Sequence, residues 1–176
     1  MDRAELAKRV YGASHLTGRF RLRSGSYSDQ YFDKYRFESD PELLGEIGDA
    51  LVELVPDGAE LLAGLELGGV PLATVASQRT GMPLVFVRKQ AKEYGTCKQV
   101  EGSDPSGRRV VIVEDVVTSG GAILDALPPL RAVGAEVVAA ICAIDREAGA
   151  REALAAEGVP LHAAFTMSAL LEASVS

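Results

Sequence analysis

Two adjacent carboxylates, Glu114 and Asp115, stand directly before a glycine-containing turn, and this segment is the part of the chain best suited to chemistry. Residues 109–114 are mostly β-branched and predict a buried strand, while apolar residues after position 121 predict a helix. Glycines between a strand and a helix let backbone N–H groups close on a phosphate at the helix N-terminus. Acids beside such a turn would repel a nucleotide phosphate, but they suit a sugar that carries both a phosphate and free hydroxyls.

The turn differs from two common nucleotide-binding motifs. No Gly-Lys-Ser/Thr follows its glycines, so it is not a P-loop, and it lacks the G-x-G-x-x-G pattern of a dinucleotide site. An ordinary strand–loop–helix connection with stray acids is the simpler alternative. The complete run E-D-x-x-T-S-G-G disfavours that alternative.

This run resembles the 5-phosphoribosyl-1-pyrophosphate (PRPP) loop of the type I phosphoribosyltransferase family. The resemblance implies that Glu114 and Asp115 hold the ribose hydroxyls and act in catalysis, and that the following residues cradle the 5′-phosphate. The implied PRPP-binding residues of this loop are Glu114, Asp115, Val116, Val117, Thr118, Ser119, Gly120, Gly121 and Ala122.

A second segment, residues 88–107, follows a predicted strand and shows no clear periodicity. Arg88, Lys89 and Lys92 place three cations within five residues, which suits a polyanion such as pyrophosphate; a solvated charged surface is the alternative. The segment is similar to the mobile loop of orotate phosphoribosyltransferases, in which R-K-x-x-K reaches the pyrophosphate of a neighbouring subunit. The resemblance implies that Arg88 and Lys92 are catalytic, that Lys89 and Tyr94 also bind PRPP, and that the protein is a homodimer sharing this loop.

Two further segments carry implied PRPP contacts. Gly68 and Gly69 follow the predicted strand 60–64 and resemble the pyrophosphate loop of the family, although a tight turn used only for packing would look the same. Arg23 lies in a predicted hairpin turn that resembles the N-terminal hood of the family and is implied to approach PRPP.

The implied orotate-binding residues come from separate parts of the chain. Tyr31 and Phe32 resemble an aromatic pair that covers orotate, or they form the core of the hood. Arg146 matches an arginine that pairs with the orotate carboxylate, whereas a helix-capping salt bridge is the competing account. Thr118 of the PRPP loop is implied to contact orotate as well.

Three positions depart from the family pattern. Arg23 stands where lysine is common, Gly68 where many members carry a pyrophosphate-binding lysine, and Tyr94 where many carry a histidine. Arg23 keeps the charge, but Gly68 and Tyr94 each remove one anion contact. These departures put the rate and the PRPP affinity in doubt more than the class of reaction.

Composition restricts the classes of protein to which the chain can belong. The 176 residues predict one domain, and a net charge of −7 argues against nucleic-acid binding. No secretory signal and no apolar run of membrane-spanning length is visible, so we expect no membrane partner and a cytoplasmic protein. Cys142 lies in an apolar run and Cys97 in a polar one, which predicts a core residue and an accessible thiol without a disulfide.

Alternating elements predict an α/β protein in which helices flank a parallel sheet, and the resemblance implies the type I phosphoribosyltransferase fold. We expect a small N-terminal hood over about residues 1–38 and a core over about 39–176, within a single domain. A helix is predicted over 2–12, hood strands over 19–22 and 30–37, and a helix start at Asp40-Pro41. Further strands are predicted over 60–64, 84–87, 109–114, 136–144 and 160–165, and further helices over 70–80, 121–133, 148–157 and 167–173.

The resemblance implies transfer of the 5-phosphoribosyl group from PRPP to orotate in pyrimidine biosynthesis. It also implies Mg²⁺, held mainly by PRPP and water rather than by protein ligands. Three alternatives stay open at this point. They are a phosphoribosyltransferase for another base, a PRPP-sensing regulator that acts on nucleic acid, and an inactive paralogue.

Overall fold

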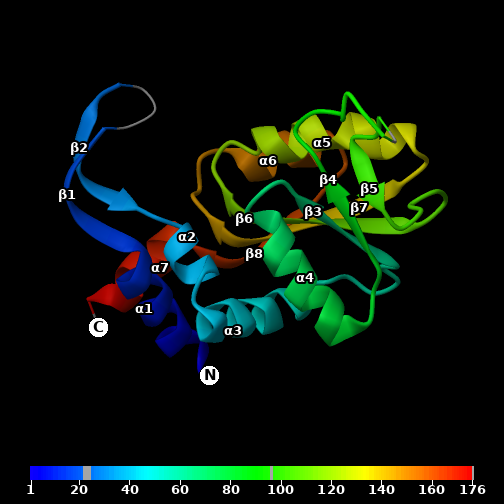
Figure 1. Ribbon diagram of the computed structural model, residues 1–176. Coiled ribbons are helices and arrows are strands. Elements are labelled where there is room, and N and C mark those ends of the chain that lie inside the picture. Colours follow the sequence, from blue (N-terminus) through cyan, green and yellow to red (C-terminus); the bar gives the residue numbers. More distant parts are fainter. Residues whose placement is uncertain (22–24, 96, 176) are drawn as a thin grey trace.

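The structure, a computed structural model, describes residues 1–21, 25–95 and 97–175 and is built on a six-stranded sheet with helices on both faces (Figure 1). The strand order is β5-β4-β3-β6-β7-β8, and all neighbours are parallel except the antiparallel pair β4 and β5. The strands are β1 (His15–Arg21), β2 (Tyr27–Phe32), β3 (Leu61–Leu65), β4 (Leu84–Val87), β5 (Val100–Gly102), β6 (Arg109–Val117), β7 (Glu136–Asp145) and β8 (Leu161–Thr166). The helices are α1 (Arg3–Ser14), α2 (Tyr35–Glu38), α3 (Pro41–Val52), α4 (Gly69–Thr80), α5 (Gly121–Ala132), α6 (Ala150–Ala156) and α7 (Met167–Ser174).

Strand β6 shows why the sheet is covered on both faces. Val111 and Val113 pack into the cluster with α1, α3, α4 and α7, whereas Val110 and Ile112 pack into the cluster with α5 and α6. All four side chains are fully buried. A continuous apolar run is therefore required here, as in other strands of parallel sheets. The predicted α/β class and parallel sheet are confirmed.

Most predicted boundaries agree with the structure to within a few residues. The start of α3 is the clearest case, because the Asp40 carboxylate accepts hydrogen bonds from the backbone N–H groups of Glu42 (2.9 Å) and Leu43 (3.1 Å). Cys142 is fully buried and Cys97 is exposed, and both are free thiols as expected. Across the described residues, no helix has both the length and the apolar character that a membrane span would need.

The N-terminal hairpin of β1 and β2 projects from the body of the molecule, while α1 packs beside α7 beneath the sheet (Figure 1). The prediction of one strand over 30–37 is wrong beyond Phe32, because the chain turns into α2. The Asp33 carboxylate accepts a hydrogen bond from the backbone N–H of Tyr35 (3.2 Å), and such local bonds compete with strand formation. The turn lets Phe37 become fully buried.

The segment 88–107 also contains structure that the sequence did not predict. Strand β5 pairs antiparallel with β4, with Val100 opposite Val87 and Gly102 opposite Val85. Three residues that include a glutamate and a glycine give no readable alternation, so the pattern could not reveal this strand. The irregular part of the segment is therefore shorter than expected, and β5 anchors its C-terminal side.

Candidate active site

The acidic pair lies at the C-terminal end of β6, at the edge of a parallel sheet where ligands commonly bind. Glu114 and Asp115 are 7% and 1% exposed. The backbone N–H of Asp115 donates to the Glu114 carboxylate (2.9 Å), and the Asp115 carboxylate accepts hydrogen bonds from the Val116 N–H and the Lys34 ammonium. The two carboxyl groups are thus fixed by hydrogen bonds and lie next to a cation.

Lys34 and Glu38 belong to this site, and the sequence interpretation missed both. Lys34 immediately precedes α2, is about one-third exposed and forms an ion pair with Asp115. Glu38, four residues later, is buried at 8% exposure, and its Oε1 has no hydrogen-bond partner in the part of the chain that the structure describes. Their spacing is the sole available signal, and Lys–Glu pairs four residues apart are common on exposed helices.

Burial and hydrogen bonding divide the protons unequally among the three carboxyl groups. Burial raises the pKa of Glu114 to about 9 and that of Glu38 to about 8, and a hydrogen bond with Asp115 adds to both shifts. Burial also acts to raise the pKa of Asp115, but hydrogen bonds from Glu114 and Lys34 outweigh it and hold this pKa below its usual value. At neutral pH, Asp115 is therefore the anion of the cluster, and Glu38 and Glu114 carry protons.

Replacing Glu38 with glutamine should remove a pH-dependent loss of stability. The folded-state pKa of Glu38 is about 8 and its ordinary value is 4.5, so the favourable protonated state is fully present below pH 4.5 and is lost as pH rises through 8. We expect Glu38→Gln to match the native protein at pH 5 and to gain about 2 kcal/mol at pH 9, which raises the thermal midpoint by about 4–8 °C. Thermal unfolding followed by circular dichroism between pH 5 and 9 measures this difference.

Glu42→Gln is the matched control, because its carboxylate is exposed and paired with Arg9 at 2.8 Å. This hydrogen bond lowers the pKa of Glu42, so its removal should give no gain in stability at high pH. Parallel pH profiles for Glu38→Gln and the native protein would contradict the proton assignment.

The glycine turn and the start of α5 surround a cavity of about 500 Å³. Within the described residues, no side chain caps α5, so the first backbone N–H groups of this helix are free to bind an anion. Gly120 has φ +82° and lies against Ala150 and Leu154, which explains the glycine at this turn. The cavity is lined by Lys89, Glu114, Val116, Val117, Thr118, Ser119, Gly120, Gly121, Ala122, Ile123 and Asp125.

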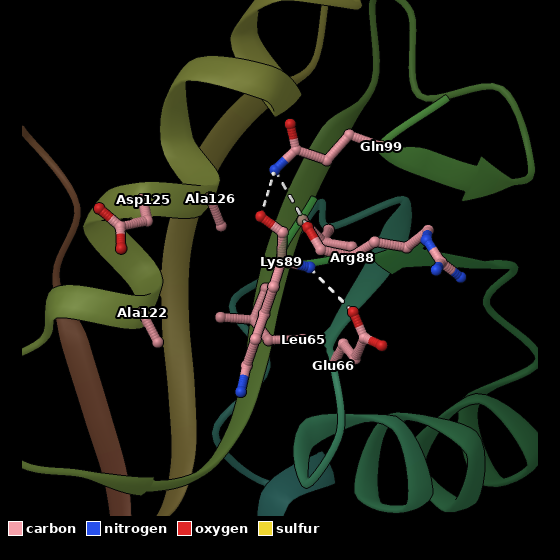
Figure 2. Close-up of a pocket in the computed structure, with 9 residues that line it drawn as sticks. Leu65, Glu66, Arg88, Lys89, Gln99, Ala122, Asp125 and Ala126 are labelled. Carbon is pink, nitrogen blue, oxygen red and sulfur yellow. Dashed lines mark hydrogen bonds between the residues drawn. The ribbon is translucent and has the colours of Figure 1, made fainter. Parts of the chain in front are cut away.

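An adjoining cavity of about 220 Å³ lies between α5 and the start of the cationic segment (Figure 2). The Gln99 amide donates hydrogen bonds to the backbone carbonyls of Arg88 (3.0 Å) and Lys89 (3.3 Å), and the Glu66 carboxylate accepts one from the Lys89 N–H (2.9 Å). These bonds fix the backbone where the segment leaves β4. Lys89 lines both cavities and is thus the cation of the segment nearest the glycine turn.

Arg88 also lines the adjoining cavity, but Lys92 lines neither of the two. The Lys92 ammonium pairs with Glu101 of β5 at 2.6 Å, and Lys92 lines a third cavity of about 500 Å³ together with Arg88, Lys89 and Tyr94. The buried Nε of Arg88 has no hydrogen-bond partner among residues 1–21, 25–95 and 97–175, and Tyr94 is 74% exposed. The structure therefore brings Lys89 to the glycine turn, whereas Lys92 pairs with Glu101 of β5.

The two glycines at the start of α4, Gly68 and Gly69, lie against β6. A β-carbon at Gly69 would lie 2.2 Å from the Val113 carbonyl oxygen, and one at Gly68 would lie 1.4 Å from Asp115 Oδ2. Packing alone explains why both positions lack a side chain. The same packing brings the start of α4 against Asp115, so the packing role is compatible with the predicted role in ligand binding.

Comparison with known proteins identifies the family. Residues 37–158 match the family described as phosphoribosyl transferase domain. An orotate phosphoribosyltransferase from a Nocardioides species is 52% identical over 167 residues, which cover 95% of this chain and 93% of that protein. This chain belongs to the orotate phosphoribosyltransferase family. Solved orotate phosphoribosyltransferases from Mycobacterium tuberculosis superpose with TM-scores of 0.88 (Fe(III) dicitrate complex, 37% identity) and 0.83 (PRPP complex, 34% identity), each over 97% of this chain and 99% of the other.

The hood residues that the resemblance to orotate phosphoribosyltransferases assigned to substrates lie on or beside the hairpin. Tyr31 is 44% exposed and stacks on Phe20 at 5.5 Å, whereas Phe32 is half-buried and contacts Tyr11 at 6.5 Å between ring centroids. Phe32 therefore serves the core at least in part. Arg23 lies outside the residues that the structure describes, and its role stays a prediction.

The predicted orotate-binding arginine of this family member is exposed at the end of β7. The backbone N–H of Arg146 donates to the Val117 carbonyl (2.8 Å), which places it beside the PRPP loop and its exposed Thr118. The buried Asp145 carboxylate pairs with Arg151 (2.7 Å) rather than with Arg146. The structural salt bridge that the sequence offered as the alternative is therefore made by Arg151. Arg146 stays a candidate for binding the carboxylate of a substrate.

Proposed function

We propose that this protein transfers the 5-phosphoribosyl group of PRPP to N1 of orotate, giving orotidine 5′-monophosphate and pyrophosphate for pyrimidine biosynthesis. The observation that carries the proposal is the acidic pair at the end of β6, whose Glu114 lines the cavity at the uncapped N-terminus of α5, in a chain closely related to orotate phosphoribosyltransferases. This arrangement suits a ligand that presents hydroxyl groups next to a phosphate. The PRPP complex of the M. tuberculosis relative supports the same ligand.

The reaction separates charge, and the site is complementary to that separation. As the C1–oxygen bond of PRPP breaks, positive charge grows on the ribosyl ring and negative charge grows on pyrophosphate. Asp115 would stabilise the ring and, with Glu114, hold the ribose hydroxyls, while the N–H groups of residues 118–122 bind the 5′-phosphate. Arg88, Lys89 and Lys92 would neutralise pyrophosphate, and Arg146 would pair with the orotate carboxylate.

Magnesium is part of this proposal. The described residues hold no group of three or more histidine, cysteine, aspartate or glutamate side chains suited to a metal ion. The proposed ion would bind mainly to PRPP and water, because Mg²⁺ commonly keeps several waters and uses few protein ligands. When bound, Mg²⁺ would neutralise part of the pyrophosphate charge.

A homodimer with a shared cationic segment is also proposed. Lys92 pairs with Glu101 outside the cavity at the glycine turn, so its own subunit does not present it to the phosphate site in this arrangement. A neighbouring subunit could supply it, and closure of the segment would exclude water from PRPP. We place this reaction in the cytoplasm.

Loss of orotate absorbance in the ultraviolet tests the proposal directly. With PRPP and MgCl₂ present, orotate should be consumed and pyrophosphate released in equal amounts, and excess EDTA should reduce the rate at least about tenfold. Uracil, adenine, guanine and hypoxanthine, tested in parallel by pyrophosphate release, should react at least about 100-fold more slowly. Faster reaction with another base would replace orotate as the substrate, and no reaction with any base would favour an inactive paralogue or a PRPP-binding regulator.

A further inference from the structure

Lys34 is the cation in direct contact with the acidic pair, and it lies two residues after Phe32 of the hood, although the sequence did not assign Lys34 itself to the site. Its ammonium occupies the Asp115 carboxylate, the group expected to bind ribose hydroxyls. A ribose that binds Asp115 must therefore share this carboxylate with Lys34 or displace it.

The position of Lys34 is linked to the absence of a side chain at residue 68. Gly68 has φ −66° and ψ −30°, a backbone conformation that any residue can adopt, so its backbone does not require glycine. The Asp115 carboxylate, bound to Lys34, fills the place where a β-carbon of residue 68 would lie. The Lys34 ammonium thus sits beside the start of α4 and next to the predicted pyrophosphate loop.

The charges of the cluster suggest a second role for Lys34, which is to offset negative charge when PRPP binds. PRPP brings several negative charges to a place that already holds the Asp115 carboxylate, and the Lys34 ammonium is paired with that carboxylate in this structure. In PRPP the pyrophosphate is on C1 and the nearest ribose hydroxyl is on C2, the adjacent ring carbon. When the Asp115 carboxylate binds these hydroxyls, the Lys34 ammonium beside it is therefore next to the ring carbon that carries the pyrophosphate.

We propose that Lys34 binds PRPP: its ammonium neutralises Asp115 in the empty site and turns to the pyrophosphate oxygens when the ribose hydroxyls occupy Asp115. This inference rests on the proposed function, because it takes PRPP as the ligand. Many family members carry a pyrophosphate-binding lysine at the position of Gly68. Under this proposal, Lys34 of the hood supplies a cation for the pyrophosphate in this protein.

The test compares two ligands that share the ribose 5-phosphate group and differ in the pyrophosphate. Binding of PRPP and of ribose 5-phosphate is measured by calorimetry with MgCl₂ and without orotate. Lys34→Gln should weaken PRPP binding about 10–100-fold, the effect of one charge-assisted contact, and should weaken ribose 5-phosphate binding less than about threefold. Lys34→Arg should recover most of the PRPP affinity. Arg36→Gln, which removes an exposed cation two residues after Lys34, should bind both ligands as the native protein does.

Each outcome decides the inference. Equal losses for both ligands would show that Lys34 only positions Asp115, and unchanged binding would remove it from the site; either result overturns the proposal. Lys34→Met, of similar length and without charge, replaces Lys34→Gln if that variant does not fold by circular dichroism. Native protein that fails to bind PRPP would overturn the proposed function itself, whereas native binding that Lys34 does not affect would overturn this inference alone.

Discussion

Asp115→Asn is expected to lower kcat/KM for PRPP about 10³-fold while the thermal midpoint changes by only a few degrees. Asp115 is the ionised carboxyl of the cluster, so its charge is the one available on β6 to stabilise a positive ribosyl ring. Asparagine has the same shape, and its one carbonyl oxygen can accept the hydrogen bond from either Val116 N–H or Lys34, which in the native protein bind different oxygens of Asp115. The loss should therefore appear in turnover, where charge complementarity in a buried site commonly contributes two to three orders of magnitude.

Asp49→Asn is the control for this variant. Asp49 lies on α3 and forms an exposed ion pair with Arg79 (2.7 Å) of α4. Removing this carboxylate should leave turnover unchanged. A pH–rate profile of both proteins should accompany the assay, because the native profile depends on the protonation of the cluster. An Asp115→Asn protein that keeps more than about one-tenth of native kcat/KM would exclude Asp115 as the main stabilising charge.

The sequence was sufficient for the parts of this molecule that repeat a strong local pattern. The continuous apolar run of β6, with both faces buried, and the Asp40-Pro41 helix start are physical requirements of a covered parallel sheet and a capped helix. The order of the motifs also placed the acidic pair and the glycine turn at one sheet edge. The structure confirms that Glu114 and the residues of this turn line one cavity.

The parts that failed depend on contacts between distant residues. Lys34 and Asp115 are 81 positions apart, and no spacing rule connects them. The Asp115 carboxylate fills the place that a side chain at residue 68 would take, a contact between residues 47 positions apart that the sequence does not reveal, while the effect of Gly68 on anion binding stays a prediction. Strand β5 forms because it can pair with the edge of β4. Three residues of sequence are too few to predict this pairing. Tertiary packing, rather than local propensity, decides each of these features.

Lys92 presents the opposite situation, because the sequence assigned it a large role and the structure holds it away from the cavity. Its ammonium pairs with Glu101, and its backbone N–H bonds to the Lys98 carbonyl at 3.3 Å, so the segment folds back on itself. Both Lys92 and Glu101 are partly exposed, and such a pair stabilises the fold little. Lys92 can therefore leave Glu101 at small cost when an anion of higher charge arrives.

Lys92→Ala is thus expected to lower kcat about 10²–10³-fold with a thermal midpoint within about 2 °C of the native value. The reason is that the removed charge acts mainly on the departing pyrophosphate and little on the fold. The orotate assay measures turnover, and thermal unfolding measures stability. Lys98→Ala, which removes a cation from the same segment, should keep turnover within about threefold of native. A fully active Lys92→Ala protein would remove this residue from the mechanism.

Mixed dimers decide whether Lys92 acts in its own subunit or in a neighbour. Heterodimers of Lys92→Ala and Asp115→Asn subunits, purified with two different tags, contain one intact site if the segment is shared, because Asp115 of one subunit meets Lys92 of the other. They should recover about half of native turnover per dimer, since one of two equivalent sites is restored. Heterodimers of the Lys92→Ala/Asp115→Asn double variant with native subunits give the reverse result: they are inactive if the segment is shared and half-active if each subunit is self-contained. The pair of measurements therefore assigns the segment even when the absolute rates are unknown, because the two arrangements exchange which mixture is active.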